Sequence, residues 1–288
     1  MLIRQPKCPH CSFDLIGNLP FCERCKFDID YGLLVKKGNC IYCKSHKTTD
    51  EHIFGDWLSK RYNWLATDST RILARPEQPS IKSIIHIHKY KGKQTRRAYQ
   101  EKTRSVCAPC NNGWLSEIHK KNQQILIKLV ENENLNIRDC EFSSLAHWIF
   151  MVAINCQYAG RIITTTEKQR HEFSKNQLPE GCLEISYLRT TDNFPTVQRS
   201  LSMNVIEGNN IVAKRGIVYF FVENIAFLII TSTSADDFKS FSSTVSELQH
   251  LSKFRKIWPI IEDKPLWGDL NWNYVHEFTN VIMGTIIE

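Results

Sequence analysis

Hydrophobic residues are most concentrated at residues 145–160, LAHWIFMVAINCQYAG, where the apolar run is interrupted by His147 and Asn155. The run is shorter than the ~20 apolar residues that a membrane-spanning helix requires. It therefore predicts a helix buried in a protein core, and no membrane partner.

Apolar positions at helical spacing predict three further helices. They cover residues 114–132, 167–177 and 236–251, the last opened by an aspartate cap. Short apolar and alternating runs predict strands at 183–189, 198–208, 210–222 and 225–234. Turns are expected at Gly208-Asn209-Asn210 and at Glu223-Asn224. The pattern predicts an α+β domain over residues 131–288.

In the first half, residues 81–100 (IKSIIHIHKYKGKQTRRAYQ) predict a β-hairpin that turns at Lys91-Gly92-Lys93. Its polar positions carry five cations that could follow a phosphate backbone: Lys89, Lys91, Lys93, Arg96 and Arg97. The same charges would also protect an exposed sheet edge from aggregation, so both interpretations stay open.

The charge distribution bears on that choice. The chain has a net charge of +7, but residues 1–130 carry +12 and residues 131–288 carry −5. Basicity confined to one half favours a polyanionic partner for that half, against the alternative of an ordinary solvated surface. The basic N-terminal residues have no apolar run behind them, which excludes a signal peptide and predicts a cytoplasmic location.

The basic half is also rich in cysteine, and eight of the eleven cysteines form Cys-x-x-Cys pairs. The pairs are Cys8/Cys11, Cys22/Cys25, Cys40/Cys43 and Cys107/Cys110. A two-residue gap places both sulfurs on one tight turn, so two pairs complete a tetrahedral Zn²⁺ site. A reducing cytosol favours metal over disulfides. The isolated cysteines are predicted to be small buried hydrophobes: Cys140, Cys156 and Cys182.

Pairing by proximity predicts two structural Zn²⁺ ions. The first pair of motifs, Cys8, Cys11, Cys22 and Cys25, forms a small zinc ribbon over residues 1–37 with its turn at Gly17-Asn18. The second zinc joins Cys40/Cys43 to Cys107/Cys110 and clamps the segment between them. Completion of a site by His10, His46 or an isolated cysteine stays open as an alternative.

The segment between Cys43 and Cys107 contains Asp50-Glu51-His52 near its start. Asn111 directly follows Cys110, the last cysteine of the predicted second zinc site. Asparagine is a good helix N-cap, so Asn111 or Asn112 could simply begin the following helix. An amide oxygen can also ligate a hard divalent cation, and a neighbouring zinc-bound cysteine would fix its position. His52 taken alone fits a surface histidine at a helix N-terminus that is capped by Asp50.

The motifs CIYC, DEHI and CAPCNNGW followed by Glu117 resemble the treble-clef branch of the HNH, or ββα-metal, endonucleases. The resemblance covers residues 38–130, and residues 145–160 are similar to a segment that follows this core in a bacterial subgroup. It implies a strand, strand and helix arranged around zinc, and a nuclease activity.

By position, the resemblance implies that His52 is the general base, that Glu51 ligates a catalytic Mg²⁺ or similar divalent ion, and that Asn111 is the second ligand. The family more often has histidine at the last position, and its middle asparagine has no clear counterpart in residues 100–107. Adjacent residues on a strand face opposite sides, so a twist or bulge is expected to bring His52 to the phosphate.

Asp56, Glu117 and His119 are further candidates. Glu117 matches the subgroup motif and could support the metal indirectly, although an ordinary helix-surface carboxylate fits equally well. Trp57 and Trp114 are predicted to pack over the zinc rather than to stack on bases.

Two hypotheses follow. The first is a metal-dependent endonuclease of restriction, phage defence or mobile elements, with DNA as its substrate by family precedent. Residues 131–288 would then set target choice, regulation or dimerisation, so a homodimer or a regulatory partner protein stays open. The second is a non-catalytic zinc-dependent nucleic-acid-binding protein in which the His52 site is vestigial.

Overall fold

The computed structural model describes most of the chain between residues 39 and 259. The described residues are 39–44, 47–62, 71–72, 87–88, 99, 102–131, 139–160, 163–194, 198–207, 210–246 and 254–259. The predicted zinc ribbon with Cys8, Cys11, Cys22 and Cys25 lies outside them, as do the hairpin cations Lys89, Lys91, Lys93, Arg96 and Arg97.

The described residues form a mixed α+β structure built on one four-stranded antiparallel sheet. Its strands, in the order β6-β7-β5-β8, are β5 (Leu183–Phe194), β6 (Gln198–Glu207), β7 (Asn210–Ser232) and β8 (Arg255–Trp258). Two separate two-stranded antiparallel sheets are formed by β1 (Thr48–His52) with β4 (Lys102–Cys107), and by β2 (Arg71–Ile72) with β3 (Ile87–His88). The predicted α+β class is therefore confirmed.

The residues of β7 form a hairpin whose first part pairs with β6 and whose second part pairs with β5. The two parts lie side by side: the Thr233 N–H donates to the Lys214 carbonyl at 3.1 Å, and the Phe220 and Phe227 ring centroids are 5.2 Å apart. The turn expected at Glu223-Asn224 is therefore confirmed, and Glu223 has the positive φ, 54°, that a tight hairpin turn requires. Its irregular backbone is held in the interior by Tyr99, whose hydroxyl accepts the Glu223 N–H at 3.0 Å and donates to its carboxylate at 2.9 Å.

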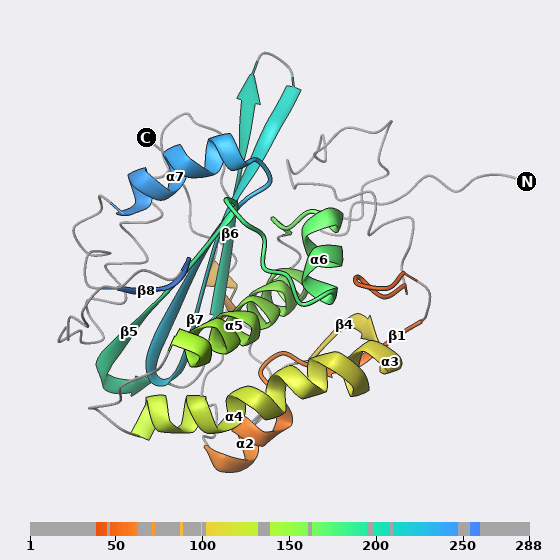
Figure 1. Cartoon of the computed structure of the whole chain (residues 1–288), viewed down its shortest axis with the longest axis vertical. Coiled ribbons are helices and arrows are strands. Elements are labelled where there is room, and N and C mark those ends of the chain that lie inside the picture. Colours follow the sequence, from red (N-terminus) through yellow and green to blue (C-terminus); the bar gives the residue numbers. More distant parts are fainter. Residues whose placement is uncertain are drawn as a thin grey trace, which may run out of the picture.

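Helix α5 (Asp139–Gly160) lies between the sheet and the elements of the first half, as Figure 1 shows. It contacts strands β5, β6, β7 and β8 on one side, and β4 and helix α4 (Ser116–Glu131) on the other. Residues 145–154 are buried except for His147, so the predicted buried core helix is confirmed. Among the described helices, none combines the length and hydrophobicity needed to cross a membrane.

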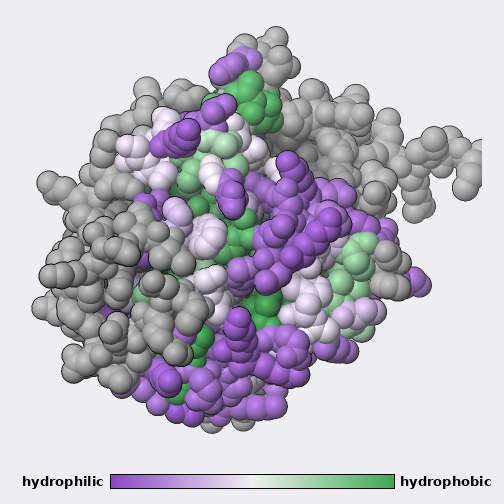
Figure 2. All heavy atoms as spheres, viewed as in Figure 1, coloured by the Kyte–Doolittle hydropathy of each residue, from purple (hydrophilic) through white to green (hydrophobic). Residues whose placement is uncertain are grey.

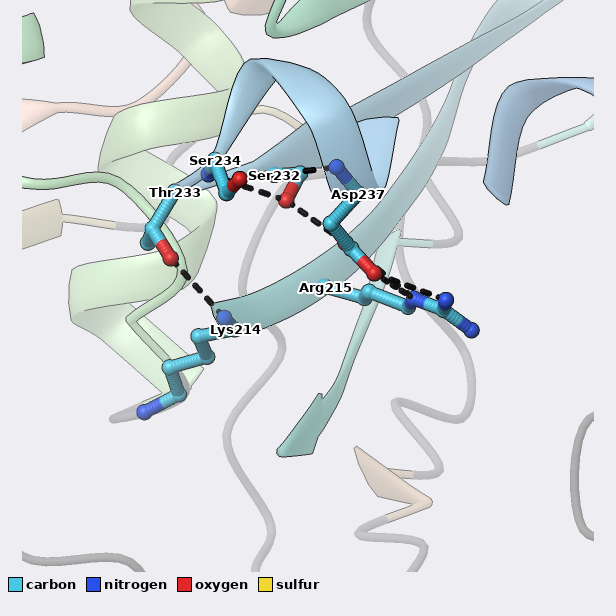
Figure 3. Close-up of polar contacts among 6 residues, drawn as sticks. All are labelled: Lys214, Arg215, Ser232, Thr233, Ser234 and Asp237. Atoms are coloured by element: carbon cyan, nitrogen blue, oxygen red, sulfur yellow. Dashed lines mark hydrogen bonds and ion pairs between the residues drawn. The ribbon is translucent and has the colours of Figure 1, made fainter. Parts of the chain in front are cut away.

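The predicted helix at 236–251 is observed as α7 (Ala235–Ser246), but an aspartate does not cap it. The Ser234 hydroxyl accepts the N–H of Asp237 at 3.4 Å, while the Asp237 carboxylate accepts bonds from Arg215 and from Ser232. We call these residues and their bonded neighbours the clamp cluster (Figure 3): Lys214, Arg215, Ser232, Thr233, Ser234 and Asp237. The short helix predicted at 167–177 is α6 (Glu167–Ser174), which a Thr166–Gln169 capping box begins.

One hydrophobic core joins the segments on both sides of residue 130. Phe54 packs edge-on against Phe220, and Phe220 against Trp148. The C-terminal carbonyls of α4 accept bonds from Arg189 and Asn224 of the second half. The first half of the chain is thus supported by the helix and sheet of the second.

Hydrophilic side chains cover much of the described surface in Figure 2. A hydrophobic patch lies near the top of that view, over the outer end of the β6–β7 pair. Ile211 and Val212, at the start of β7, are the large hydrophobic residues found exposed in the described ranges.

Candidate functional site

Four cysteines from two distant segments meet in one cluster. The sulfurs of Cys40, Cys43, Cys107 and Cys110 all lie within 4.8 Å of one another, and the Cys43 and Cys107 sulfurs are 3.5 Å apart. A tetrahedral Zn²⁺ with Zn–S bonds of about 2.3 Å places its sulfurs roughly 3.8 Å apart. The predicted meeting of the two motifs is confirmed, and the cluster could hold a metal ion.

Aromatic side chains cover this cysteine cluster. The Trp114 side chain donates a hydrogen bond to Cys110, and its ring packs edge-on against Tyr42 with centroids 5.0 Å apart. Phe173 of α6 packs against both Trp114 and Tyr42. Burial raises the pKa of the Cys110 thiol, so a cation is needed to favour the thiolate there. Trp114 therefore packs over the cluster, as the sequence predicts.

An irregularity in the β1–β4 pair directs Asp50 toward solvent and Glu51 into the interior. Thr49 pairs with Val106 but Glu51 pairs with Thr103, so the register shifts between them. Asp50 is consequently exposed and bonds Arg104 at 2.5 Å, while the Glu51 side chain is only 5% exposed. The expected bulge is confirmed, and Asp50 does not cap a helix because Gly55 occupies the N-cap of α2 (Asp56–Arg61).

Glu51 and Asn111, which are far apart in the sequence, meet in the interior. Burial raises the pKa of Glu51 to about 7, while a hydrogen bond from the Asn111 side chain and the charge of Lys102 act in the opposite direction. Asn111 does not begin a helix: α3 (Ala108–Cys110) starts before it, with Cys107 as N-cap, and the π-helical turn η1 (Asn111–Leu115) continues into α4. The N-cap interpretation of Asn111 is therefore wrong.

His52 ends strand β1 beside Glu51, and its side chain is 23% exposed. Its Nδ1 atom lies 3.9 Å from a carboxylate oxygen of Asp56, which also pairs with Lys60 at 2.5 Å. Burial lowers the pKa of His52, the charges of Lys102 and Lys60 lower it further, and Asp56 raises it. The imidazole is thus neutral at neutral pH and able to accept a proton.

His119 of α4, a further candidate from the sequence that had no assigned role, also reaches Glu51. Its side chain is 12% exposed, and its Nε2 atom lies 4.0 Å from Glu51 Oε1. The indole N–H of Trp148, on α5, donates to His119 Nδ1 at 3.1 Å. Helical spacing agrees with its inward position, because His119 lies one turn after the buried Leu115 and one turn before the buried Asn122.

Glu117, in contrast, points away from the site. Its side chain is 68% exposed and pairs with Lys120 at 2.7 Å on the outer face of α4. The motif position that suggested a supporting carboxylate therefore gives a surface ion pair, and His119 provides the inward-facing polar group two residues later.

Gly55 closes the loop before α2 directly onto His119. Its φ is +83°, a region that side chains other than glycine rarely adopt. A Cβ atom added there would lie 2.7 Å from His119 Nδ1 and 3.2 Å from Trp57 Cδ1. Only glycine therefore lets the loop pack this closely on the imidazole.

We call Glu51, His52, Asn111 and His119 the site cluster. Three of its members were predicted with roles in the reaction, and the fourth, His119, was a further candidate without an assigned role. A scan of known protein families, a search of curated proteins and a search of solved structures each find no match to the chain. Any inference about function therefore depends on the chemistry of the site cluster itself.

Proposed function

We propose that the chain is a metal-dependent endonuclease of the HNH, or ββα-metal, class that hydrolyses phosphodiester bonds in DNA. One observation carries this proposal: the Glu51 carboxylate and the Asn111 amide meet beside the four-cysteine cluster, with His52 as the next residue along the strand. Glu51 and His52 lie on β1, which pairs with β4, and Asn111 lies in η1, directly before α4.

The residues present fit a catalytic divalent cation. Glu51 is a buried carboxylate whose hydrogen-bond donor is an amide rather than a cation, and a buried carboxylate gains most from a neighbouring positive charge. Rotation of the Asn111 amide exchanges its nitrogen and oxygen, so it can present an oxygen beside Glu51. Mg²⁺ prefers few protein oxygens and keeps its remaining positions for water and phosphate. When bound, such an ion supplies charge stabilisation for the phosphate and the leaving oxygen.

His52 is the general base in this proposal. Hydrolysis requires removal of a proton from the attacking water, and a neutral imidazole suits that step. The Asp56 carboxylate lies on the Nδ1 side of the ring, at 3.9 Å, which leaves Nε2 to accept the proton. Asp56 thereby takes the orienting role for which the sequence offers no middle asparagine.

Cations beside the base favour a phosphate substrate. Lys102 and Lys60 act on the pKa of His52, and both side chains are exposed. They extend the positive charge of residues 1–130 to the site. Each phosphate that such lysines neutralise adds sequence-independent affinity. The four-cysteine cluster and the cysteines of residues 1–37 would hold the two structural Zn²⁺ ions.

Nicking of supercoiled plasmid with Mg²⁺ or Mn²⁺ tests the proposal, with a structured RNA as a second substrate. The His52→Ala variant is expected to bind DNA as the wild type does and to cleave it about 10²–10⁴-fold more slowly, the range attributed to general acid–base catalysis. His147→Ala is the matched control, because His147 bonds the carbonyls of Ser143 and Asn176 instead of the site cluster. Failure of the wild type to cleave DNA or RNA would contradict the proposal.

A non-catalytic nucleic-acid-binding protein is the second candidate. It is favoured by position 111, where asparagine replaces the more usual histidine and already donates a hydrogen bond to Glu51. In that case the wild type would shift DNA in a gel without cleaving it, and His52→Ala would behave identically.

A further inference from the structure

His119 is built into the site cluster from three sides. Trp148 bonds its Nδ1 atom, the Gly55 loop packs against its ring, and its Nε2 atom faces the Glu51 carboxylate. Nε2 is inaccessible to solvent and has no hydrogen-bond partner among the residues that the structure describes. A buried polar atom without a partner is costly, and here it lies beside a carboxylate.

The Trp148 contact fixes where the imidazole carries its hydrogen. An indole N–H is a donor only, so the Nδ1 atom that accepts from it at 3.1 Å must present a lone pair. The single hydrogen of the neutral ring then resides on Nε2. The group that faces Glu51 is therefore a hydrogen-bond donor, and its lone pair is not free for a metal.

A small movement would complete the bond. Nε2 and Oε1 are 4.0 Å apart, whereas an N–H···O hydrogen bond spans about 2.7–3.2 Å. Glu51 has a rotatable carboxylate, while Gly55 and Trp148 hold the imidazole in place. The carboxylate is thus the partner that moves.

We propose that His119 is a positioning residue that donates its Nε2–H to Glu51 and so orients the carboxylate for the divalent ion, rather than a ligand of that ion. This inference rests on the proposed function, because Glu51 is the metal ligand there. Partners that orient metal ligands typically contribute about 10–100-fold in metal affinity.

Titration of the full-length chain with Mn²⁺ alone, without nucleic acid, tests the role. His119→Ala is expected to weaken Mn²⁺ binding by about 10–100-fold, and His119→Gln is expected to recover most of it because its amide N–H can donate. His147→Ala is the control and should bind Mn²⁺ as the wild type does. Circular dichroism and zinc content verify that each variant is folded. Equal affinity of His119→Ala and wild type would overturn the proposal, as would a His119→Gln variant as weak as His119→Ala.

The imidazole tautomer separates a donor from a ligand. Long-range ¹H–¹⁵N spectra of the ¹⁵N-histidine-labelled protein should show His119 with its hydrogen on Nε2, before and after addition of Mg²⁺. Loss of that hydrogen when Mg²⁺ is added would make His119 a ligand and overturn the proposal. Trp148→Phe frees Nδ1, so the other tautomer is expected to appear and Mn²⁺ binding to weaken.

The outcomes also separate this inference from the proposed function. A wild type that binds Mn²⁺ with this variant pattern but cleaves neither DNA nor RNA leaves the role of His119 intact and removes the nuclease. A wild type that cleaves DNA while His119→Ala binds Mn²⁺ normally removes the role of His119 alone. A wild type that binds no Mn²⁺ removes the role of His119 together with the metal site.

Discussion

The site cluster and the clamp cluster are similarly buried, yet they treat their polar groups in opposite ways. The Asp237 side chain is 11% exposed and accepts bonds of 2.7 and 2.9 Å from Arg215 and of 2.8 Å from Ser232 (Figure 3). The Glu51 side chain is 5% exposed, but the titratable group that faces it, the His119 imidazole, stays 4.0 Å away, and its Nε2 atom has no hydrogen-bond partner among the described residues. A fold gains stability from the first arrangement and none from the second.

The pKa values of the two carboxyl groups follow this difference. Burial raises the pKa of both groups. At Asp237 the hydrogen bonds from Arg215 and Ser232 outweigh burial and the pKa falls, whereas at Glu51 burial prevails and the pKa rises to about 7. Strongly perturbed groups that the fold itself does not compensate are typical of functional sites. The comparison therefore marks the site cluster as the region prepared for a ligand.

The largest effect is expected from Cys110→Ser, which should remove the site cluster and leave the clamp cluster. The variant loses one of four thiolates, and structural zinc contributes about 10–16 kcal/mol of apparent binding energy in small zinc domains. Asn111, the next residue, would lose its fixed position near Glu51. We expect loss of one equivalent of bound zinc, a large fall in thermal stability and loss of Mn²⁺ binding.

Hydrogen exchange of the same variant locates the damage. Amides of β1 and α4 should exchange faster, while those of β6 and α7 should keep most of their protection because the sheet does not depend on the cysteines. Cys182→Ser is the control, because Cys182 lies outside the four-cysteine cluster. Full zinc content in Cys110→Ser would show that another residue completes the site.

An intermediate effect is expected from Arg215→Ala, which removes the cation that bonds Asp237 in the clamp cluster. Its bonds to Asp237 are charge-assisted, and hydrogen bonds to charged groups contribute about 1.5–3 kcal/mol. Urea unfolding should therefore show a loss of about 1.5–3 kcal/mol, with Mn²⁺ affinity unchanged. Arg215→Lys keeps the charge but not the paired geometry, so its loss should be smaller. A change in Mn²⁺ affinity would contradict the separation of the two clusters.

The helices and strands could be predicted from the sequence, because their formation depends on the local spacing of hydrophobic residues. The buried helix at 145–160 and the joining of Cys40/Cys43 with Cys107/Cys110 follow from hydrophobic spacing and from zinc chemistry, and both are observed. The turn at Glu223-Asn224 follows from the local turn propensities of these residues and is also observed. The buried bond between Tyr99 and Glu223, which are distant in sequence, could not be read from a local pattern.

The sequence predicted which residues form the site, but not how the helix that carries some of them is oriented. Glu51 and Asn111 were placed together by resemblance, and their hydrogen bond agrees with that placement. The orientation of α4 was not predictable from the motif, and it turns Glu117 outward and His119 inward. Tertiary packing against Trp148 and Gly55 decides which polar residue of α4 reaches Glu51.

The smallest effect, and the most direct comparison of the clusters, is the pH dependence of stability in Asp237→Asn and Glu51→Gln. The folded pKa of Asp237 lies below its ordinary 3.8, so its stabilisation is present above that pH and is lost in acid. Asp237→Asn should be less stable than wild type at about pH 8, with the difference shrinking below about pH 4. The folded pKa of Glu51 is raised from 4.5 to about 7, so its contribution is present below 4.5 and lost as the pH rises through 7. Glu51→Gln cannot ionise, and should match wild type at about pH 4 and exceed it by ~1–2 kcal/mol at about pH 8 without added divalent ions.

Urea unfolding at both pH values measures these differences, and added Mn²⁺ supplies the control. Mn²⁺ stabilises whichever protein binds it in the folded state, so it should stabilise wild type at about pH 8 and leave Glu51→Gln unchanged. Because the two substitutions each replace a buried carboxyl group by an amide, opposite signs at about pH 8 cannot come from side-chain size. A Glu51→Gln variant less stable than wild type would mean that the fold already compensates the Glu51 charge, and the two clusters would then be alike.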